Sequence, residues 1–294
     1  MIDTPISVRQ LHPLFVGDVS DVDVGGRLAP ATVRAICEAI DHYAVLIFRG
    51  QHLDDEQQLA FARYFGEIEA PRSARSGREQ RLRPELSDIS NLDANNRLRP
   101  ADDPRRFDQL GNRLWHTDGS FRRIPAALSM LYAHRVPANG GETEFADLRA
   151  AWEALPNETK ASIEGRVAMH DIAHSRAQIG FTGLLFGERD VLPPVPQLLV
   201  RIHPGSRRKT LYLASHASHL IGLPIAEGRL LLHDLIEFAT QPQFVYRHVW
   251  REDDLVIWDN RCTMHRGRPF DERETRDLRR VTTRDTSSTL DQVA

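Results

Sequence analysis

Strand-like apolar runs separated by turn residues dominate the chain from Leu128 onward. Helical spacing interrupts them at residues 147–155 and 226–240. Strands with flanking helices are typical of a sandwich or a jelly roll rather than of a doubly wound sheet. Strands are predicted at residues 128–134, 211–214, 244–250, 255–258 and 278–284. The pattern therefore predicts a mainly β fold with flanking helices.

The first part of the chain begins with a short strand and a capped helix. Residues 44–49 form a β-rich apolar run that ends at Gly50, which predicts a buried strand. Asp54 and Gln57 have the spacing of a capping box, in which each side chain bonds the other's backbone N–H. A helix is therefore predicted from this cap to about Phe65.

Residues 67–113 are polar and rich in Arg, Asp and Asn, and only residues 86–92 have a strand-like pattern. A long irregular segment in a compact enzyme is more often a functional loop than filler, so we predict an active-site lid here, with plain disorder as the alternative. No Pro/Gly/Ser linker and no internal repeat divides the chain. We therefore expect a single domain over residues 1–294.

Charge and cysteine content narrow the class of protein. The formal net charge is −3 with both signs interspersed, which argues against a nucleic-acid-binding protein. The apolar runs fall well short of the roughly 20 residues of a membrane span, and the N-terminus lacks the pattern of a signal peptide. Two cysteines, Cys37 and Cys262, indicate a reducing compartment. A soluble cytoplasmic protein is expected.

Two candidate metal ligands, His116 and Asp118, stand two residues apart, and residues at this spacing share one face of a strand. The pair alone is a weak signal, since His52 and Asp54 have the same spacing at the predicted helix cap. A second imidazole, His265, follows a predicted strand. Two histidines and one carboxylate can hold one face of an octahedral Fe(II). They leave two positions for 2-oxoglutarate and one for O2.

Two arginines could hold the distal carboxylate of such a co-substrate. Arg276 and Arg280 follow His265 by 11 and 15 residues. A guanidinium matches a carboxylate through two parallel hydrogen bonds, which a lysine cannot do. The alternative for either residue taken alone is an ordinary surface arginine.

Four motifs in order now resemble a known family. The motifs are Trp-His-Thr-Asp at 115–118, Gly-Gly-Glu-Thr-Glu-Phe at 140–145, Trp-Asp-Asn-Arg at 258–261 followed by His265, and Arg276 with Arg280. The chain resembles the TauD/TfdA family, the taurine and 2,4-dichlorophenoxyacetate dioxygenases that depend on Fe(II) and 2-oxoglutarate. This resemblance implies a double-stranded β-helix (jelly roll) core.

The resemblance also implies roles for single residues. His116, Asp118 and His265 would be the iron ligands and catalytic centre. The 2-oxoglutarate would be bound by Arg276 as the main clamp, by Thr143 and Asn112, and by Arg280, which would also bind the acidic group of the substrate.

Three further positions are candidates for substrate contact. Family position suggests His216 and His219 near the pocket, with ordinary partly buried histidines as the alternative reading. Gly119 stands where close relatives often carry Ser, directly after the metal carboxylate, so it is expected to shape the pocket.

Scaffold stretches resemble the phenoxyacetate branch more specifically, at residues 11–15, 145–151, 216–219, 227–229, 238–241 and 244–248. The implied reaction hydroxylates an aryloxyalkanoate such as 2,4-dichlorophenoxyacetate, whose product collapses to a phenol and glyoxylate, with succinate and CO2 from 2-oxoglutarate. Ascorbate is expected to help in vitro. The expected partners are a small-molecule carboxylate and further copies of the chain, as a dimer or larger homo-oligomer, without nucleic acid or membrane.

Two alternatives stay open. The same scaffold could oxidise taurine, another alkylsulfonate or a sulfate ester, since Arg280 could hold a sulfonate as well as a carboxylate. A non-catalytic, cupin-like metal-binding protein is the alternative from another class. The presence of Thr143, Arg276 and Arg280 beside the metal residues argues against it, because a simple metal box needs none of them.

Overall fold

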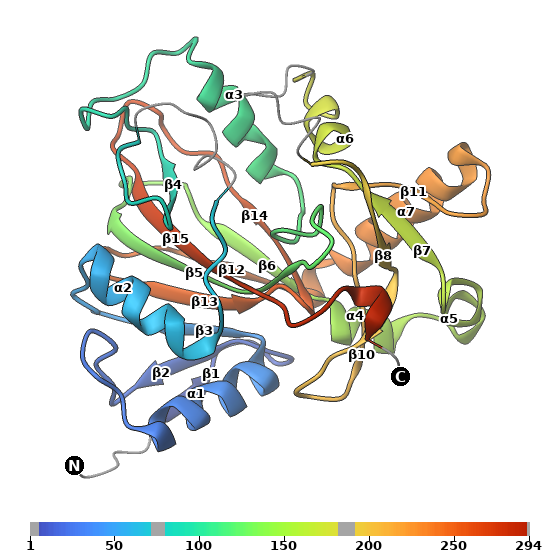
Figure 1. Ribbon diagram of the computed structural model, residues 1–294, viewed down its shortest axis with the longest axis horizontal. Coiled ribbons are helices and arrows are strands. Elements are labelled where there is room, and N and C mark those ends of the chain that lie inside the picture. The colour runs from blue at the N-terminus through green and yellow to red at the C-terminus, as the bar shows by residue number, and fades with distance from the viewer. Residues whose placement is uncertain (1–5, 72–79, 182–191, 293–294) are drawn as a thin grey trace.

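A seven-stranded sheet forms the centre of the computed structural model, which describes residues 6–71, 80–181 and 192–292. Adjacent strands are antiparallel except the second and third of this sheet, which are parallel. In spatial order the strands are β1 (Ser7–Gln10), β2 (Gly17–Ser20), β3 (Val45–Phe48), β13 (Leu255–Asp259), β5 (Ala126–Arg135), β15 (Asp277–Arg284) and β4 (Ser87–Ser90) (Figure 1).

Smaller sheets complete the β structure. The sheet that matters for the site has β6 (Thr143–Asp147) at its centre, between β12 (Val245–His248) and β14 (Thr263–Gly267). The other strands are β7 (Val167–His170), β8 (Val195–Leu198) and β11 (Ala217–Leu220) in one sheet, and β9 (Val200–Ile202) with β10 (Lys209–Leu211) in another.

Helices lie on the outside of these sheets (Figure 1). The α-helices are α1 (Pro30–Tyr43), α2 (Asp55–Ala62), α3 (Pro104–Leu110), α4 (Leu148–Ala154), α5 (Asn157–Ile163), α6 (Ile172–Ala177) and α7 (Ile225–Ala239). The 3-10 turns are η1 (Arg63–Phe65), η3 (Gly111–Arg113), η5 (Pro242–Phe244) and η6 (Thr289–Asp291). In the part of the chain that the structure describes, no helix is both long and apolar enough to cross a bilayer.

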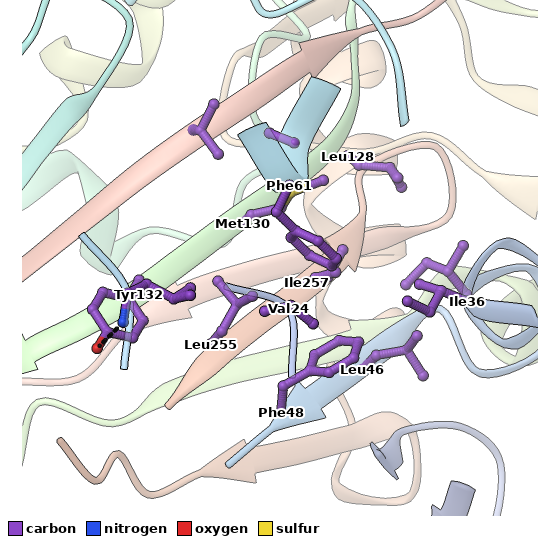
Figure 2. Packing of buried hydrophobic residues seen from close by; sticks show 14 of the residues in the cluster. Val24, Ile36, Leu46, Phe48, Phe61, Leu128, Met130, Tyr132, Leu255 and Ile257 are labelled. Carbon is purple, nitrogen blue, oxygen red and sulfur yellow. Dashed lines mark hydrogen bonds between the residues drawn. The ribbon is translucent and has the colours of Figure 1, made fainter. Parts of the chain in front are cut away.

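The period of two along the central strands divides their side chains between two cores. On β13, Leu255 and Ile257 belong to the cluster under α1 and α2, where Phe61 of α2 is also buried (Figure 2). Val256 and Trp258 point the other way, into a cluster that includes Phe145 of β6. The seven-stranded sheet therefore has one face covered by helices and one face turned toward the smaller sheet.

Polar side chains reach the space between the sheets by the same alternation. On β15, Arg280 and Thr282 fall on the face of Leu278, which belongs to the inner cluster. On β5, Ser129 shares its face with Leu131 of that cluster. The inner face thus carries polar side chains beside apolar ones, such as Trp258, which packs on Phe145 of the smaller sheet.

Most predicted elements are confirmed. The predictions for β3, β5, β13, β15, α4 and α7 hold to within about two residues at each end. Asp54 and Gln57 make both bonds of the capping box at the start of α2. That helix ends at Ala62 and passes into the 3-10 turn η1, so the predicted end at Phe65 describes two elements.

Two predicted strands are wrong in extent. Residues 212–214 are buried but lie beyond β10, which ends at Leu211, so their apolar run reflects burial rather than ladder pairing. Residues 244–250 begin in the turn η5, and only Val245–His248 pairs with β6. An apolar run shows that a segment is buried, but its pairing depends on a partner elsewhere in the chain.

The predicted lid segment has two parts in the structure. Residues 87–90 form β4, which pairs with β15 at the edge of the large sheet, so this stretch is scaffold rather than lid. Helix α3 and the turn η3 contribute residues to the walls of a cavity described below. Residues 72–79 lie outside the described residues. A lid role for the remainder stays a prediction.

One buried histidine outside the site is expected to make the stability of the fold depend on pH. His170 on β7 is fully buried against the ring of Tyr212, and neither of its ring nitrogens has a hydrogen-bond partner among the described residues. Burial lowers the pKa of His170 to about 3. The folded protein therefore leaves this ring neutral at pH values where an unfolded chain protonates it.

We expect His170→Met to flatten the pH dependence of unfolding. Because the folded pKa lies below the unfolded one, the unfolded state binds more protons between these values, and stability falls as the pH falls. This group contributes a slope of up to about 1.4 kcal/mol per pH unit. Urea denaturation of metal-free protein from pH 6 to pH 4 measures the slope. Equal slopes for wild type and variant would contradict the prediction.

Candidate functional site

Two histidines and an aspartate from two separate segments, His116 with Asp118 and His265 of β14, converge between the sheets. His116 and His265 exchange backbone hydrogen bonds of 3.0 and 2.8 Å, which brings their ring centroids to 4.2 Å. Asp118 lies with Oδ1 3.8 Å from His116 Nε2 and Oδ2 3.6 Å from His265 Nε2. One ligand atom of each residue lies within 4.8 Å of the others. This donor set matches the facial triad of non-haem Fe(II) sites.

The local structure of the first two ligands corrects the strand interpretation. His116 pairs through a single isolated bridge to His265, and Asp118 begins a turn that continues through Gly119 at φ +63°. The two side chains do converge, but a shared strand face is not the reason. They converge because the bridge fixes His116 and the turn then returns Asp118 toward it.

All three groups are held in the protonation state that binds a metal. His116 Nδ1 lies 2.8 Å from the carbonyl oxygen of Leu114, which can only accept, so this nitrogen carries the proton and leaves Nε2 as the ligand atom. Burial lowers the pKa of both His116 and His265. Burial would raise the pKa of Asp118, but Arg280 and the two histidines outweigh it and lower this pKa to about 2. The site therefore presents two neutral imidazoles and one carboxylate.

Two cavities meet at this cluster. One has a volume of about 210 Å³ and the other about 160 Å³. We call the larger one the outer cavity, lined by Asp118, and the smaller one the inner cavity, lined by His265. The residues that line both are Ile89, Gln109, Asn112, His116 and Arg280. The three candidate metal ligands thus stand at the junction of two spaces.

The inner cavity contains a buried cation, Arg276, that has no counter-ion among the residues that the structure describes. The side chain of Arg276 donates to the carbonyl oxygens of Ile89 at 3.0 Å and Gly141 at 3.4 Å. Among the described residues no carboxylate lies within 4.0 Å of its guanidinium nitrogens. Burial lowers the pKa of Arg276 to about 10, against the opposite influence of Glu272, so the group is still charged at neutral pH. A buried charge of this kind requires an anion, and the cavity in front of it can hold one.

Thr143 adds a hydrogen-bond donor to the same cavity. Its Oγ1 accepts a 3.0 Å hydrogen bond from Trp250 Nε1, and an indole N–H can only donate. The hydroxyl hydrogen of Thr143 is therefore directed to another acceptor. The turn before it needs glycine, since Gly140 has φ +79° and a Cβ there would lie 2.4 Å from the carbonyl oxygen of Pro269.

The outer cavity combines apolar walls with charged pairs. Its apolar surface includes Phe121 and Ile172, and the ion pair of Arg122 with Glu69 lies in its wall. Burial raises the pKa of Glu69, although Arg122 opposes this shift. Such a space suits a ligand with an apolar body and a few polar groups.

The two candidate substrate histidines have different positions. His216 lines the outer cavity, where its Nδ1 lies 2.9 Å from Ser120 Oγ. Its ring lies nearly perpendicular to that of Phe121, with the two ring centroids 4.9 Å apart. His219 lies on β11, with its Nδ1 3.0 Å from Ser218 Oγ, and it lines neither cavity. The structure brings only His216 to the metal residues.

Gly119 and Arg280 border the outer cavity on either side of Asp118. A Cβ on Gly119 would lie 3.0 Å from the backbone nitrogen of Ala126, and the residue has a left-handed φ, so a side chain here would be strained. Arg280 donates a 2.5 Å hydrogen bond to Asp118 Oδ1. The sequence predicted Arg280 beside the co-substrate and substrate, and its contact with the metal carboxylate is an additional finding.

A second buried group with metal-binding residue types has its atoms occupied already. His203 Nε2 lies 2.8 Å from Asp259 Oδ2, and Arg261 bonds both oxygens of the same carboxylate. His203 Nδ1 accepts from the backbone of Ser206 at 2.9 Å. Both ring nitrogens and the carboxylate are thus engaged within the protein, and this group reads as structural support.

Comparison with known proteins agrees with this geometry. The family described as "Taurine catabolism dioxygenase TauD, TfdA family" matches residues 7–282. The chain belongs to the TauD/TfdA dioxygenase family. It is therefore an oxidoreductase with the jelly-roll fold of that family.

Three relatives illustrate the similarity. The chain is 47% identical over 279 residues to the alpha-ketoglutarate-dependent 2,4-dichlorophenoxyacetate dioxygenase of Burkholderia sp. (strain RASC), covering 95% of this chain and 94% of the relative. It is 47% identical over 281 residues to the enzyme of the same name from Cupriavidus pinatubonensis, covering 95% and 98%. A crystal structure of AAD-2 in complex with Mn(II) and N-oxalylglycine superimposes with a TM-score of 0.93, at 48% identity, over 97% of this chain and all of that one.

Several residues around the TauD/TfdA site were not predicted as contacts. Trp258 lines the inner cavity and Phe121 the outer one, while Ser129 and Asn260 contact Asp118 directly. Ser129 had a signal in the sequence, because it is a small polar residue within the largely apolar run of β5. Its partner could not be read from the run.

Proposed function

We propose that this chain is an Fe(II)- and 2-oxoglutarate-dependent dioxygenase that oxidises an aryloxyalkanoate carboxylate such as 2,4-dichlorophenoxyacetate. The observation that carries the proposal is the buried Arg276, which has no counter-ion in the described part of the chain and lies in a cavity that opens onto His116 and His265. A metal box without a co-substrate would have no need of this charge. The names of the relatives and the Mn(II) and N-oxalylglycine of the AAD-2 structure support the same assignment.

The residues fit the proposed metal and co-substrate. His116, Asp118 and His265 would hold Fe(II), and the bound iron would activate O2 with electrons from 2-oxoglutarate, which leaves as succinate and CO2. Arg276 would pair with the distal carboxylate of 2-oxoglutarate, and Thr143 would donate its hydroxyl hydrogen to it. Asn112, on the wall common to both cavities, is in reach of either ligand.

The outer cavity would take the substrate. An aryl ring would pack against Phe121 and Ile172, and Arg280 would attract the carboxylate from the junction of the cavities. His216 and Gly119 would border the same ligand. In this arrangement the carbon between the ether oxygen and the carboxylate would face the metal, and the walls would exclude water from it.

The proposed reaction balances without a further reactant. One atom of O2 enters the C–H bond of the substrate, and the other enters succinate. The hydroxylated carbon carries an ether oxygen, so the product is a hemiacetal. It transfers its hydroxyl proton to the departing phenolate oxygen and breaks into a phenol and glyoxylate.

A substrate panel tests the proposal. We expect succinate formation with Fe(II), ascorbate and 2-oxoglutarate under air to rise with phenoxyacetates or phenoxypropionates, with one phenol released per succinate. Stimulation by taurine or alkyl sulfates alone would leave the metal and co-substrate assignment in place and replace the substrate. A protein that binds metal but forms no succinate, with or without these compounds, would contradict the proposal and favour the non-catalytic, cupin-like metal-binding protein.

We also propose that the protein is cytoplasmic. Cys37 and Cys262 are both free thiols, as expected for a cytoplasmic protein. We expect a dimer or larger homo-oligomer, which analytical ultracentrifugation would test.

A further inference from the structure

Two buried side chains behind Asp118 form a closed set of hydrogen bonds with it. Ser129 Oγ lies 2.8 Å from Asp118 Oδ2, and Asn260 Oδ1 accepts from the backbone N–H of Asp118 at 3.1 Å. Asn260 Nδ2 in turn donates to Ser129 Oγ at 3.0 Å. Ser129 and Asn260 are fully buried, and neither lines a cavity.

Elementary hydrogen-bond chemistry sets the direction of these bonds. Asn260 Oδ1 also accepts from Trp258 Nε1 at 3.0 Å. An indole N–H and a backbone N–H can only donate, so the oxygen of the Asn260 amide must face them and its nitrogen must face Ser129. The amide therefore cannot flip without losing both bonds.

The orientation of the Asn260 amide determines where the hydroxyl hydrogen of Ser129 points. The Ser129 hydroxyl accepts from Asn260 Nδ2, and it lies 3.1 Å from Thr282 Oγ1, which can supply a second donor. Its single hydrogen is then available to Asp118 Oδ2, an ionised acceptor that forms a stronger bond than a neutral hydroxyl would. The orientation of one amide thus determines where one hydroxyl points.

Asp118 depends on these bonds because its backbone offers little support. It begins a turn rather than pairing within a strand. One carboxylate oxygen is held by Ser129 and the other by Arg280. Ser129 and Trp258 are opposite each other on the neighbouring strands β5 and β13, so the support comes from the rigid centre of the large sheet.

We infer that Ser129 and Asn260 are positioning residues for the metal carboxylate, with Asn260 orienting the Ser129 hydroxyl and Ser129 orienting Asp118. The inference rests on the proposed metal centre. Ligating carboxylates that are held by hydrogen bonds bind metal more tightly, because the ligand geometry exists before the ion arrives. Without Ser129 the carboxylate can rotate, and binding must then order it.

The test is the affinity for Mn(II) alone, measured on the metal-free protein by electron paramagnetic resonance of the unbound ion. We expect Ser129→Ala to raise the Kd for Mn(II) by about 10- to 100-fold. Ser129→Cys, which keeps a weaker donor, should fall between wild type and Ser129→Ala. Thr210→Val is the matched control, because it removes another fully buried hydroxyl, whose bond is to the carbonyl oxygen of Leu211. Its Kd should stay within about twofold of wild type.

The outcomes separate the inference from the proposed function. A Kd for Ser129→Ala within about twofold of wild type, in protein whose thermal unfolding remains cooperative, would overturn the positioning role. A weaker affinity in Ser129→Cys than in Ser129→Ala would also overturn it, since packing and not hydrogen bonding would then govern the metal. Absence of Mn(II) binding in the wild type would overturn the metal centre itself.

Discussion

Replacing Arg276 by methionine is expected to raise the KM for 2-oxoglutarate by roughly 30-fold or more. The variant loses a buried guanidinium that has no carboxylate partner among the described residues, so the co-substrate loses its main charge-assisted contact. The clamp contacts the ground state and the transition state alike, so kcat at saturating 2-oxoglutarate should change much less than KM. Succinate formation at varied 2-oxoglutarate measures both constants.

The same variant should keep its metal site and its stability. Arg276 touches none of the three candidate ligands, so we expect the Kd for Mn(II) to stay within about twofold of wild type. Removing an unpaired buried charge is expected to leave the thermal midpoint of ligand-free protein equal or higher. Arg284→Met is a matched control from the end of β15, the strand that begins directly after Arg276, since Arg284 pairs with Glu67 at the surface. An unchanged KM in Arg276→Met would remove this residue from its proposed role.

Replacing Asp118 by alanine is expected to abolish turnover and to weaken Mn(II) binding by more than the roughly 100-fold typical of a lost supporting contact. The pKa of Asp118 is lowered to about 2, so wild type presents a full negative charge to the metal at any working pH. The variant retains only two neutral imidazoles. Metal titration followed by succinate assays at high Fe(II) measures both effects.

The control for this variant is a carboxylate outside the site. Asp271 is exposed, and its carboxylate bonds only Arg273 among the described residues, so Asp271→Ala should keep wild-type metal affinity and turnover. Iron-dependent turnover that survives in Asp118→Ala would remove Asp118 from the metal centre. Wild-type metal affinity in both Asp271→Ala and Asp118→Ala would indicate that the metal is bound elsewhere.

Prediction from the sequence succeeded where the chemistry or the geometry is local. The capping box at Asp54 and Gln57 lies within one helical turn, so its bonds follow from spacing alone. The candidate ligands His116, Asp118 and His265 could be named because few residue types can hold a metal, and the structure brings them together. Their roles, and that of Arg276, stay predictions. The order of their motifs along the chain then identified the family.

Prediction was wrong or silent where the answer depends on distant partners. Residues 212–214 are apolar and buried, yet no strand ladder includes them, because ladder pairing needs a second strand in register. His216 and His219 could not be told apart, since the side chain that reaches the cavity depends on how β11 and the loop before it are placed.

The sequence by itself determined the fold class and named residues whose chemistry suits a metal or a carboxylate, because these follow from patterning and from the chemistry of single side chains. Only the tertiary structure showed that Arg276 is buried with no counter-ion from residues 6–71, 80–181 and 192–292. Only it showed that Asp118 lies on a turn and that Ser129 of β5 bonds it. Ser129 and Asn260 are far apart along the chain and meet only because β5 pairs with β13. Burial and hydrogen-bond partners arise from that pairing, and no local pattern of residues contains it.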